Sequence, residues 1–190
     1  MKISFIENSP FAVRFTASGI DTATANALRR IATGSVPTFA IDTVTFYENT
    51  SAMFDEYIAH RIGLIPIITP GKGYDEKDEI MFSLEAEGPI TAYSGDLKSS
   101  DKNVKVANEK IPIMKLAEGQ RLKLEGKAVM GVGSRHAKFQ PGLATYKLLD
   151  NGDFEFYVEA FGQMPAMEIV NKALAVLEKQ LKELQSTLKK

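Results

Sequence analysis

The residues best placed to do chemistry are Glu56 and His60, four apart on one face of an expected helix, with Asp55 and Arg61 beside them. A carboxylate beside an imidazole can act in acid–base catalysis or bind a metal ion. A zinc site needs at least three protein ligands, and the only other histidine, His136, lies in a segment without ligand spacing. We therefore interpret this group as an ordinary capped helix, with a small metal-assisted hydrolase as the alternative.

Other forms of catalysis and cofactor binding find little support in the chain. The segment Gly-Val-Gly-Ser at 131–134 resembles a phosphate-binding loop. It lacks the lysine and the helix that follow such a loop, so we interpret it as a turn. The absence of cysteine excludes thiolate catalysis, disulfides and sulfur-ligated metals. No cluster of aspartates suited to two-metal chemistry is present. We predict no catalytic residue, no cofactor and no metal.

The charge balance and hydropathy limit the possible environments. The formal net charge is −1, so any contact with nucleic acid must be local or indirect. The N-terminus begins with Lys2 and then alternates, and no apolar run approaches about 18 residues. These features predict a cytoplasmic protein with neither a signal peptide nor a membrane span.

The element that positions the adjacent Arg29 and Arg30 is an expected helix over residues 21–34. Asp21 is a good N-cap, and a glycine at position 34 tolerates the left-handed conformation that often ends a helix. Small and apolar side chains share one face, which is flat enough for another helix to approach; they are Ala23, Ala27, Leu28 and Ile31. The two arginines point elsewhere, and a pair of basic residues is usually a solvated face.

A second helix is expected around Glu56 and His60. Ser51 is the candidate N-cap, Gly63 the end, and Phe54, Ile58 and Ile62 the buried stripe. The remaining regular structure is expected to be strand because apolar residues alternate with polar ones. The expected strands are 2–8, 11–17, 41–47, 81–87, 121–130, 143–149 and 154–161, the last two joined by a tight turn at Asn151-Gly152 with positive φ at both residues.

The final helix, from about Pro165, carries apolar residues at gaps of three and four. They are Met167, Val170, Leu174, Leu177, Leu181, Leu184 and Leu188. This seven-residue repeat is typical of two helices wrapped around each other, although three heptads are the lower limit for that interpretation. An intramolecular core helix is the common alternative. We expect the first half to pack on its own domain and the leucine end to extend to another chain.

Six segments, in this order, resemble the D-type subunit of archaeal DNA-directed RNA polymerase, a family related to the N-terminal domain of the bacterial alpha chain. The resemblance spans nearly the whole chain. The segments are Asn-Ala-Leu-Arg-Arg (26–30), Val-Pro-Thr-Phe-Ala-Ile-Asp (36–42), Asn-Thr-Ser (49–51), Ala-His-Arg-Ile-Gly-Leu-Ile-Pro (59–66), His-Ala-Lys-Phe-Gln-Pro (136–141) and Met-Pro-Ala-Met-Glu-Ile-Val (164–170).

The resemblance implies an α+β fold in which both chain ends, 1–38 and 142–190, form a dimerisation domain around an inserted, mostly β domain at 39–141. It implies a heterodimer with the small L subunit of the polymerase through Ala27, Leu28, Ile31, Leu174, Leu177, Leu181, Leu184 and Leu188. It also implies that Arg29, Arg30, His60 and Arg61 dock the large subunits. Cysteine-bearing metal loops found in many relatives are missing here.

The function implied by the resemblance is a noncatalytic platform for assembling a DNA-directed RNA polymerase. The pair with the L subunit would recruit the small N and P adaptor subunits and then the large catalytic subunits, so DNA is contacted only through the complex. A stand-alone homodimeric structural protein using the same leucine seam is the rival interpretation.

Overall fold

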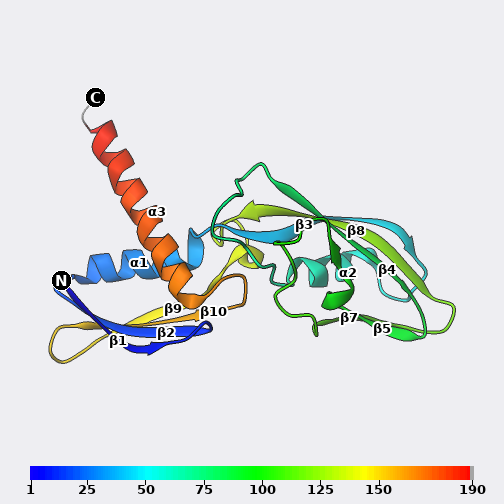
Figure 1. Ribbon diagram of the computed structural model, residues 1–190, viewed down its shortest axis with the longest axis horizontal. Coiled ribbons are helices and arrows are strands. Elements are labelled where there is room, and N and C mark those ends of the chain that lie inside the picture. Colours follow the sequence, from blue (N-terminus) through cyan, green and yellow to red (C-terminus); the bar gives the residue numbers. More distant parts are fainter. Residues whose placement is uncertain (189–190) are drawn as a thin grey trace. The chain divides into compact units, whose positions relative to one another are not determined.

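The computed structural model describes residues 1–188 and shows an α+β protein with antiparallel sheets and three α-helices in that range (Figure 1). The chain divides into two compact units. The first combines Met1–Pro37 with the described residues from Val132 onward, and the second is Thr38–Gly131. Residues 132–141, which the family resemblance assigned to the inserted domain, cluster with the first unit.

The first unit contains a four-stranded sheet built from both ends of the chain. Its order is β1 (Lys2–Asn8), β2 (Ala12–Ser18), β10 (Phe154–Ala160) and β9 (Gly142–Leu148), with each neighbouring pair antiparallel. At the centre, Phe15 lies opposite both Phe5 and Phe156, and its ring stacks on that of Phe156 at 5.1 Å between centroids. The central strand β2 therefore joins the first residues of the chain to residues far along the sequence.

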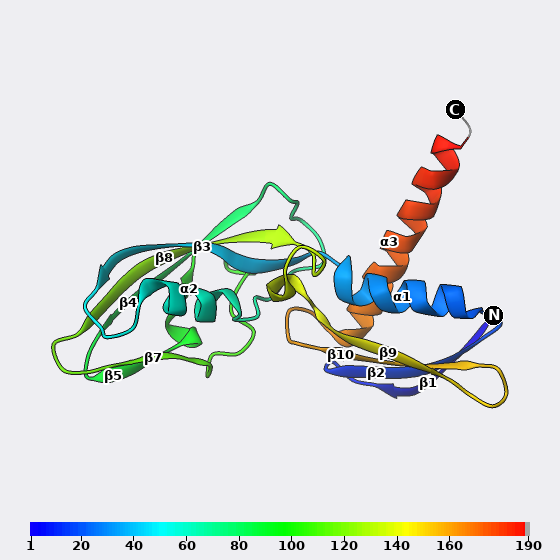
Figure 2. The same ribbon diagram turned by 180° about the vertical axis from the view of Figure 1, so that it is seen from behind.

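Helices α1 (Thr22–Gly34) and α3 (Ala166–Thr187) cover one face of this sheet (Figures 1 and 2). The predicted cap of α1 is confirmed, since the Thr24 backbone N–H donates to Asp21 Oδ1 at 2.8 Å. The predicted left-handed glycine is wrong. Gly34 is the last helical residue, and the Ser35 N–H closes the final turn on the Ile31 carbonyl without a positive φ at residue 34.

The hairpin between β9 and β10 is confirmed, but its turn differs from the prediction. Only Gly152 has a positive φ, of 84°, whereas Asn151 does not. The Asn151 side chain instead accepts from the Asp153 N–H at 3.1 Å, and the Gly152 N–H donates to the Leu149 carbonyl at 2.9 Å. Because the loop is longer than two residues, one left-handed glycine is enough to reverse the chain.

The second unit has a larger sheet of order β3 (Thr38–Asn49), β8 (Arg121–Gly131), β4 (Glu79–Glu87) and β6 (Lys98–Ser99). A ribbon of β5 (Ile90–Tyr93) and β7 (Pro112–Leu116) and the helix α2 (Asp55–Gly63) complete it. The short 3₁₀ helix η1 (Ser94–Asp96) belongs here, and η2 (Ala137–Phe139) belongs to the first unit.

Alternation in the strands of the second unit gives it one buried face, as predicted. Phe82, Leu84, Leu122 and Leu124 are at most 1% exposed and belong to one core cluster with Ile58 and Ile62 of α2. Two predictions about α2 are wrong. The helix begins at Asp55 with Phe54 as its N-cap, whereas Ser51 Oγ bonds to Asn49 and Met53 in the preceding turn. Phe54 is 70% exposed and does not belong to the buried stripe.

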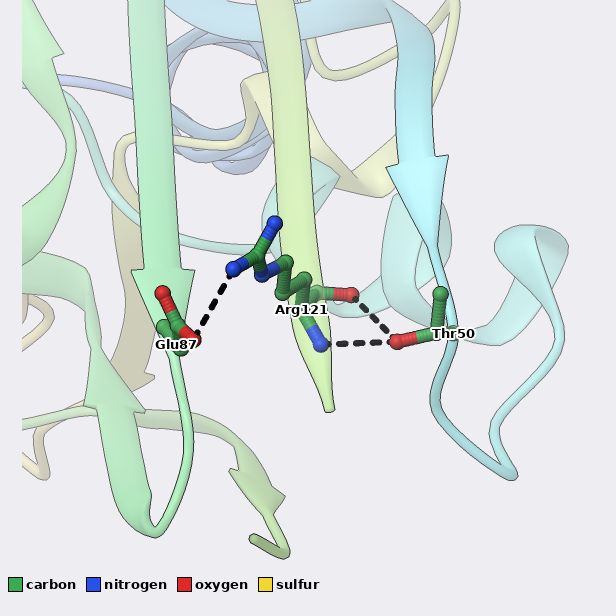
Figure 3. Close-up of polar contacts among 3 residues, drawn as sticks. All are labelled: Thr50, Glu87 and Arg121. Carbon is green, nitrogen blue, oxygen red and sulfur yellow. Dashed lines mark hydrogen bonds and ion pairs between the residues drawn. The ribbon is translucent and has the colours of Figure 1, made fainter. Parts of the chain in front are cut away.

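The outward face of the same sheet is charged and paired across strands. Lys127 lies 2.9 Å from Glu79, Lys123 lies 3.3 Å from Glu85, and Arg121 lies 3.1 Å from Glu87. Figure 3 shows the last pair, together with Thr50, whose Oγ1 accepts from the Arg121 backbone N–H at 2.8 Å. The ion pair with Glu87 raises the pKa of Arg121. Glu85 faces Lys123 and Glu87 faces Arg121, while Glu79 is diagonal to Lys127, and these opposite charges favour this register over a slipped one.

Candidate subunit interface

The first unit contains the helices whose apolar faces the sequence assigned to a partner. Helices α1 and α3 pack against each other and against the sheet. Ile31 is only 8% exposed and belongs to the core of its own unit, while Leu28 and Leu177 are partly buried beside it. Ala27 is half-buried. The part of α1 nearest to α3 is thus largely used within the chain, and only its margin offers surface.

From Leu174 onward α3 is different, because most of its leucine side chains are exposed. Leu174, Leu181, Leu184 and Leu188 are 46%, 56%, 57% and 77% exposed. The buried residues of the helix all lie earlier, at Ala166, Ile169, Val170 and Ala173. A helix whose apolar stripe continues past the edge of its own core presents that stripe to another surface. We call Leu174, Leu177, Leu181, Leu184 and Leu188 the leucine seam.

Local ion pairs support this extended part of α3. Lys182 Nζ lies 2.5 Å from Glu178 Oε1, and Lys179 lies 3.9 Å from Glu183, both pairs at i,i+4 spacing. Bonding to Lys182 lowers the pKa of Glu178. Such pairs stabilise an exposed helix slightly. The seam is therefore carried on a helix whose opposite side is charged.

A second apolar surface of the first unit, on the edge strand β1, was not recognised in the sequence. Every residue of β1 is exposed, and Ile3, Phe5 and Ile6 are 48%, 56% and 57% exposed. The strand pairs with β2 along one side only. The signal in the sequence was the adjacent pair Phe5-Ile6, which gives the strand apolar side chains on both faces.

The two arginines of the first unit differ in their surroundings. Arg29 Nε and Nη2 donate to Asn26 Oδ1 at 3.3 and 2.9 Å, which holds the guanidinium against its own helix. Arg30 is exposed, and its guanidinium has no hydrogen bond or ion pair within residues 1–188, although its carbonyl accepts from Thr33 Oγ1 at 3.2 Å. Both line a groove of about 650 Å³ that also includes Ser134 and Leu177. Arg30 is therefore the guanidinium available to a partner.

His60 and Arg61 lie in the second unit, on α2. Arg61 donates from Nε to the Ile113 carbonyl at 2.8 Å and from Nη2 to the Pro112 carbonyl at 2.6 Å. This fork ties α2 to β7, so Arg61 has an internal role that the sequence did not reveal. His60 is exposed. The four residues expected to dock the large subunits are thus divided between the units, Arg29 and Arg30 in one and His60 and Arg61 in the other.

The acid–base alternative gains no support from the geometry around Glu56. Both Glu56 and His60 are exposed on α2, and residues 1–188 contain no group of three or more His, Asp or Glu placed to bind a metal. His136 is used elsewhere, since its Nδ1 accepts from the Lys138 N–H at 3.1 Å at the start of η2. Across the same residues, no helix is long and apolar enough to cross a membrane.

The fold and the exposed seam define a class of protein once they are set beside known families. The RNA polymerase Rpb3/RpoA insert domain matches residues 40–150, which include all of the second unit except its first two residues. The class is therefore that of RNA polymerase subunits related to Rpb3 and RpoA, which carry this inserted domain.

Individual relatives narrow that class. The chain is 52% identical over 153 residues to DNA-directed RNA polymerase subunit Rpo3 of Methanocaldococcus jannaschii, covering 80% of this chain and 78% of the relative. It is 52% identical over 155 residues to subunit Rpo3 of Thermococcus kodakarensis, covering 78% and 60%. For Rpo3 of Natronomonas pharaonis the identity is 43% over 162 residues, covering 81% and 65%. The chain belongs to the archaeal Rpo3 family, the D-type polymerase subunits that its sequence resembles.

The covered share of these relatives differs. The match spans about three fifths of the length of the Thermococcus relative and over three quarters of the Methanocaldococcus one.

Proposed function

We propose that this chain is a noncatalytic assembly subunit of DNA-directed RNA polymerase that heterodimerises with the L subunit through the leucine seam. The observation that carries the proposal is the leucine seam, in which Leu174, Leu181, Leu184 and Leu188 are between 46% and 77% exposed. The polymerase would perform nucleotidyl transfer as a whole complex. This chain would supply a surface on which the N and P subunits and the large subunits assemble.

The magnitude of the apolar burial indicates how large the interface must be. Covering a leucine that is already about half buried contributes about 1 kcal/mol, so the four exposed leucines together contribute roughly 4 kcal/mol. Association costs about 4–15 kcal/mol in lost translational and rotational freedom. The four leucines therefore supply only part of the required free energy from this side of the interface, and the margin of α1 at Ala27 and Leu28 would enlarge it.

The basic residues supply orientation in this proposal. Arg30 is open to solvent in the first unit and would hold a carboxylate or a carbonyl of a large subunit in a fixed fork. Arg29 keeps its bond to Asn26 and supports the same groove. Exposed His60 on α2 would contact a large subunit directly. Arg61 would contribute indirectly, because its bond to the Ile113 carbonyl holds β7 in position against α2.

The rival function, a stand-alone homodimer, uses the same seam and differs in the partner. Native mass measurement of the purified chain, alone and after co-expression with a candidate L subunit, distinguishes the two. We expect a one-to-one heterodimer after co-expression. A monodisperse homodimer that excludes the L subunit would overturn the proposal.

The role of the seam is tested by charge substitution. Leu177→Asp combined with Leu181→Asp places two carboxylates in the apolar interface, so we expect co-purification with the L subunit to be lost. The matched control is Ala175→Asp with Ser186→Asp, on the opposite side of α3, which leaves pairing intact. Hydrogen exchange of the second unit reports that it stays folded in both variants. Pairing retained in the seam variant would contradict the proposed interface.

A further inference from the structure

Two aromatic rings of the second unit stand in solvent at the start of α2. Phe54 is 70% exposed and Tyr57 is 65% exposed, and their ring centroids lie 6.3 Å apart at an interplanar angle of 33°. They border a groove of about 600 Å³ whose walls include Met53 and Met114. Met114 is only 6% exposed and Met53 is partly buried, so the two exposed rings stand over an apolar wall. Aromatic residues and methionine are enriched at the centres of protein interfaces.

The core of the unit does not explain these rings. Ile58 and Ile62 already fill the buried face of α2 and are 0% exposed. Phe54 occupies the N-cap position, where it makes no side-chain hydrogen bond to the helix. Asp, Asn, Ser or Thr would stabilise the helix end better there. The chain thus has an exposed phenylalanine at a position where local stability favours a polar residue.

The residues that line the groove include bases and no acids, although Asp55 and Glu56 lie next to Phe54 and Tyr57 in the first turn of α2. The basic lining residues of the groove are His60, Arg61 and Lys115. The Arg61 fork is already bonded to the β7 carbonyls. Lys115 has no ion pair or hydrogen-bonded side-chain partner within residues 1–188. A carboxylate approaching the groove would therefore meet an unpaired ammonium beside apolar walls.

We propose that this groove binds a segment of another RNA polymerase chain that inserts an apolar side chain between Phe54, Tyr57 and Met114 and places a carboxylate on Lys115. The inference rests on the proposed function and deepens it, because the groove is lined by His60, for which a contact with a large subunit is proposed above. It assigns to the second unit a docking site of its own.

A nucleic acid is the less favoured occupant, although bases stack on aromatic rings. Asp55 and Glu56 lie in the first turn of α2 beside the rings, and the formal net charge of the chain is −1. A phosphate backbone would meet these carboxylates. A peptide with a single acid can place that acid on Lys115 of β7 and is repelled less than a continuous phosphate backbone.

The test places a photo-crosslinking p-benzoylphenylalanine at position 57 of the chain within reconstituted polymerase. We expect a crosslink to one segment of another polymerase subunit that contains an acidic residue beside a large apolar one. Lys115→Glu is expected to lower the crosslink yield by roughly threefold to tenfold. Lys98→Glu, an exposed change on β6 outside the groove, leaves the yield unchanged. Replacing the acid of the captured segment by lysine restores the yield with Lys115→Glu.

Several results would overturn this inference. They are no crosslink, a crosslink to nucleic acid or to a second copy of this chain, or a yield that Lys115→Glu does not change. The same photoreactive residue at position 184 reports separately on the leucine seam. A crosslink at 184 with none at 57 refutes the groove and leaves the proposed heterodimer standing, whereas loss of the 184 crosslink alone counts against the heterodimer.

Discussion

The two units of this protein differ in how far their apolar residues are buried. In the second unit the strands bury Phe82, Leu84 and Leu122 on one face and present cross-strand ion pairs on the other. In the first unit the core closes over Ile31 and Phe156, yet the second half of α3 and all of β1 stay exposed. The second unit thus buries most of its apolar residues apart from those at one groove, whereas the first unit leaves a long apolar surface exposed.

This difference separates residues buried in the chain's own cores from exposed residues that a partner would cover in the proposed heterodimer. A buried leucine of the second unit such as Leu84 and an exposed leucine of the seam such as Leu184 are the same chemical group, but only the first lies in a core of the isolated chain. Substitutions in the two units should therefore affect different measurements, stability in one and pairing in the other.

The largest effect on stability is expected for Phe82→Ala in the second unit. Phe82 is fully buried, so its truncation leaves a cavity and costs about 3–5 kcal/mol of unfolding free energy. Leu184→Ala in the seam, at a site 57% exposed, should change stability by less than about 0.5 kcal/mol. Hydrogen exchange of the isolated chain, resolved by unit, measures both. Equal losses would show that the seam is part of the chain's own core.

An intermediate effect, confined to the first unit, is expected for Gly133→Ala. A Cβ at this position would lie 2.3 Å from the Thr33 carbonyl oxygen, so the loop must move away from the end of α1. Overpacking of this kind costs about 1–3 kcal/mol. The matched control is Gly34→Ala, whose Cβ would meet only the Ser134 Cβ at 4.0 Å. Denaturant unfolding, followed by hydrogen exchange of α1, distinguishes Gly133→Ala from Gly34→Ala. Equal destabilisation of the two variants would argue against a clash between the new Cβ and the Thr33 carbonyl.

The smallest effect is expected for Asp21→Ala at the start of α1. Hydrogen bonding from Thr24 lowers the pKa of the Asp21 carboxyl below its ordinary value of 3.8. Because the folded-state pKa is the lower one, the stabilisation is complete above the ordinary value and is lost as the pH falls through the folded-state pKa. The difference in unfolding midpoint between the native chain and Asp21→Ala should therefore become smaller as the pH is lowered.

The matched variant for that cap is Asp21→Asn, which keeps a side-chain acceptor without a titrating group. It should lose this pH dependence while keeping α1 capped at neutral pH. Unfolding midpoints measured across the acid range test both variants. A difference between the native chain and Asp21→Ala that does not change with pH would contradict the role given to the ionised carboxylate.

Much of this fold follows from patterns along the sequence. Period-two alternation located β4 and β8 and named their buried residues, and the Asp21 cap located the start of α1. The heptad spacing of α3 predicted a helix whose stripe is longer than its own core. Each of these signals depends on neighbours within a few residues, which is why the sequence alone was sufficient.

The errors share a different cause, since they depend on contacts that spacing along the chain does not reveal. Ser51 has the chemistry of a helix cap, but its hydroxyl bonds to Asn49 and Met53 in the turn before the helix. The sequence suggests that Arg61 is a surface charge, but its guanidinium donates to the carbonyls of Ile113 and Pro112, about fifty residues further along the chain. Phe54 has the right spacing for the buried stripe of α2, yet it lies one residue before the helix begins.

The pairing of β2 with β10 also bears on how the polypeptide emerges from the ribosome. Synthesis proceeds at about 5–20 residues per second. Thr38–Gly131 is contiguous and contains every strand that its own sheet needs, whereas β2 must wait for β10 before it gains its second neighbour. The seam on α3 is translated later still. The leucines of the seam are therefore made after the strands of both sheets, which in the proposed heterodimer shortens the time in which the seam can bind the wrong protein.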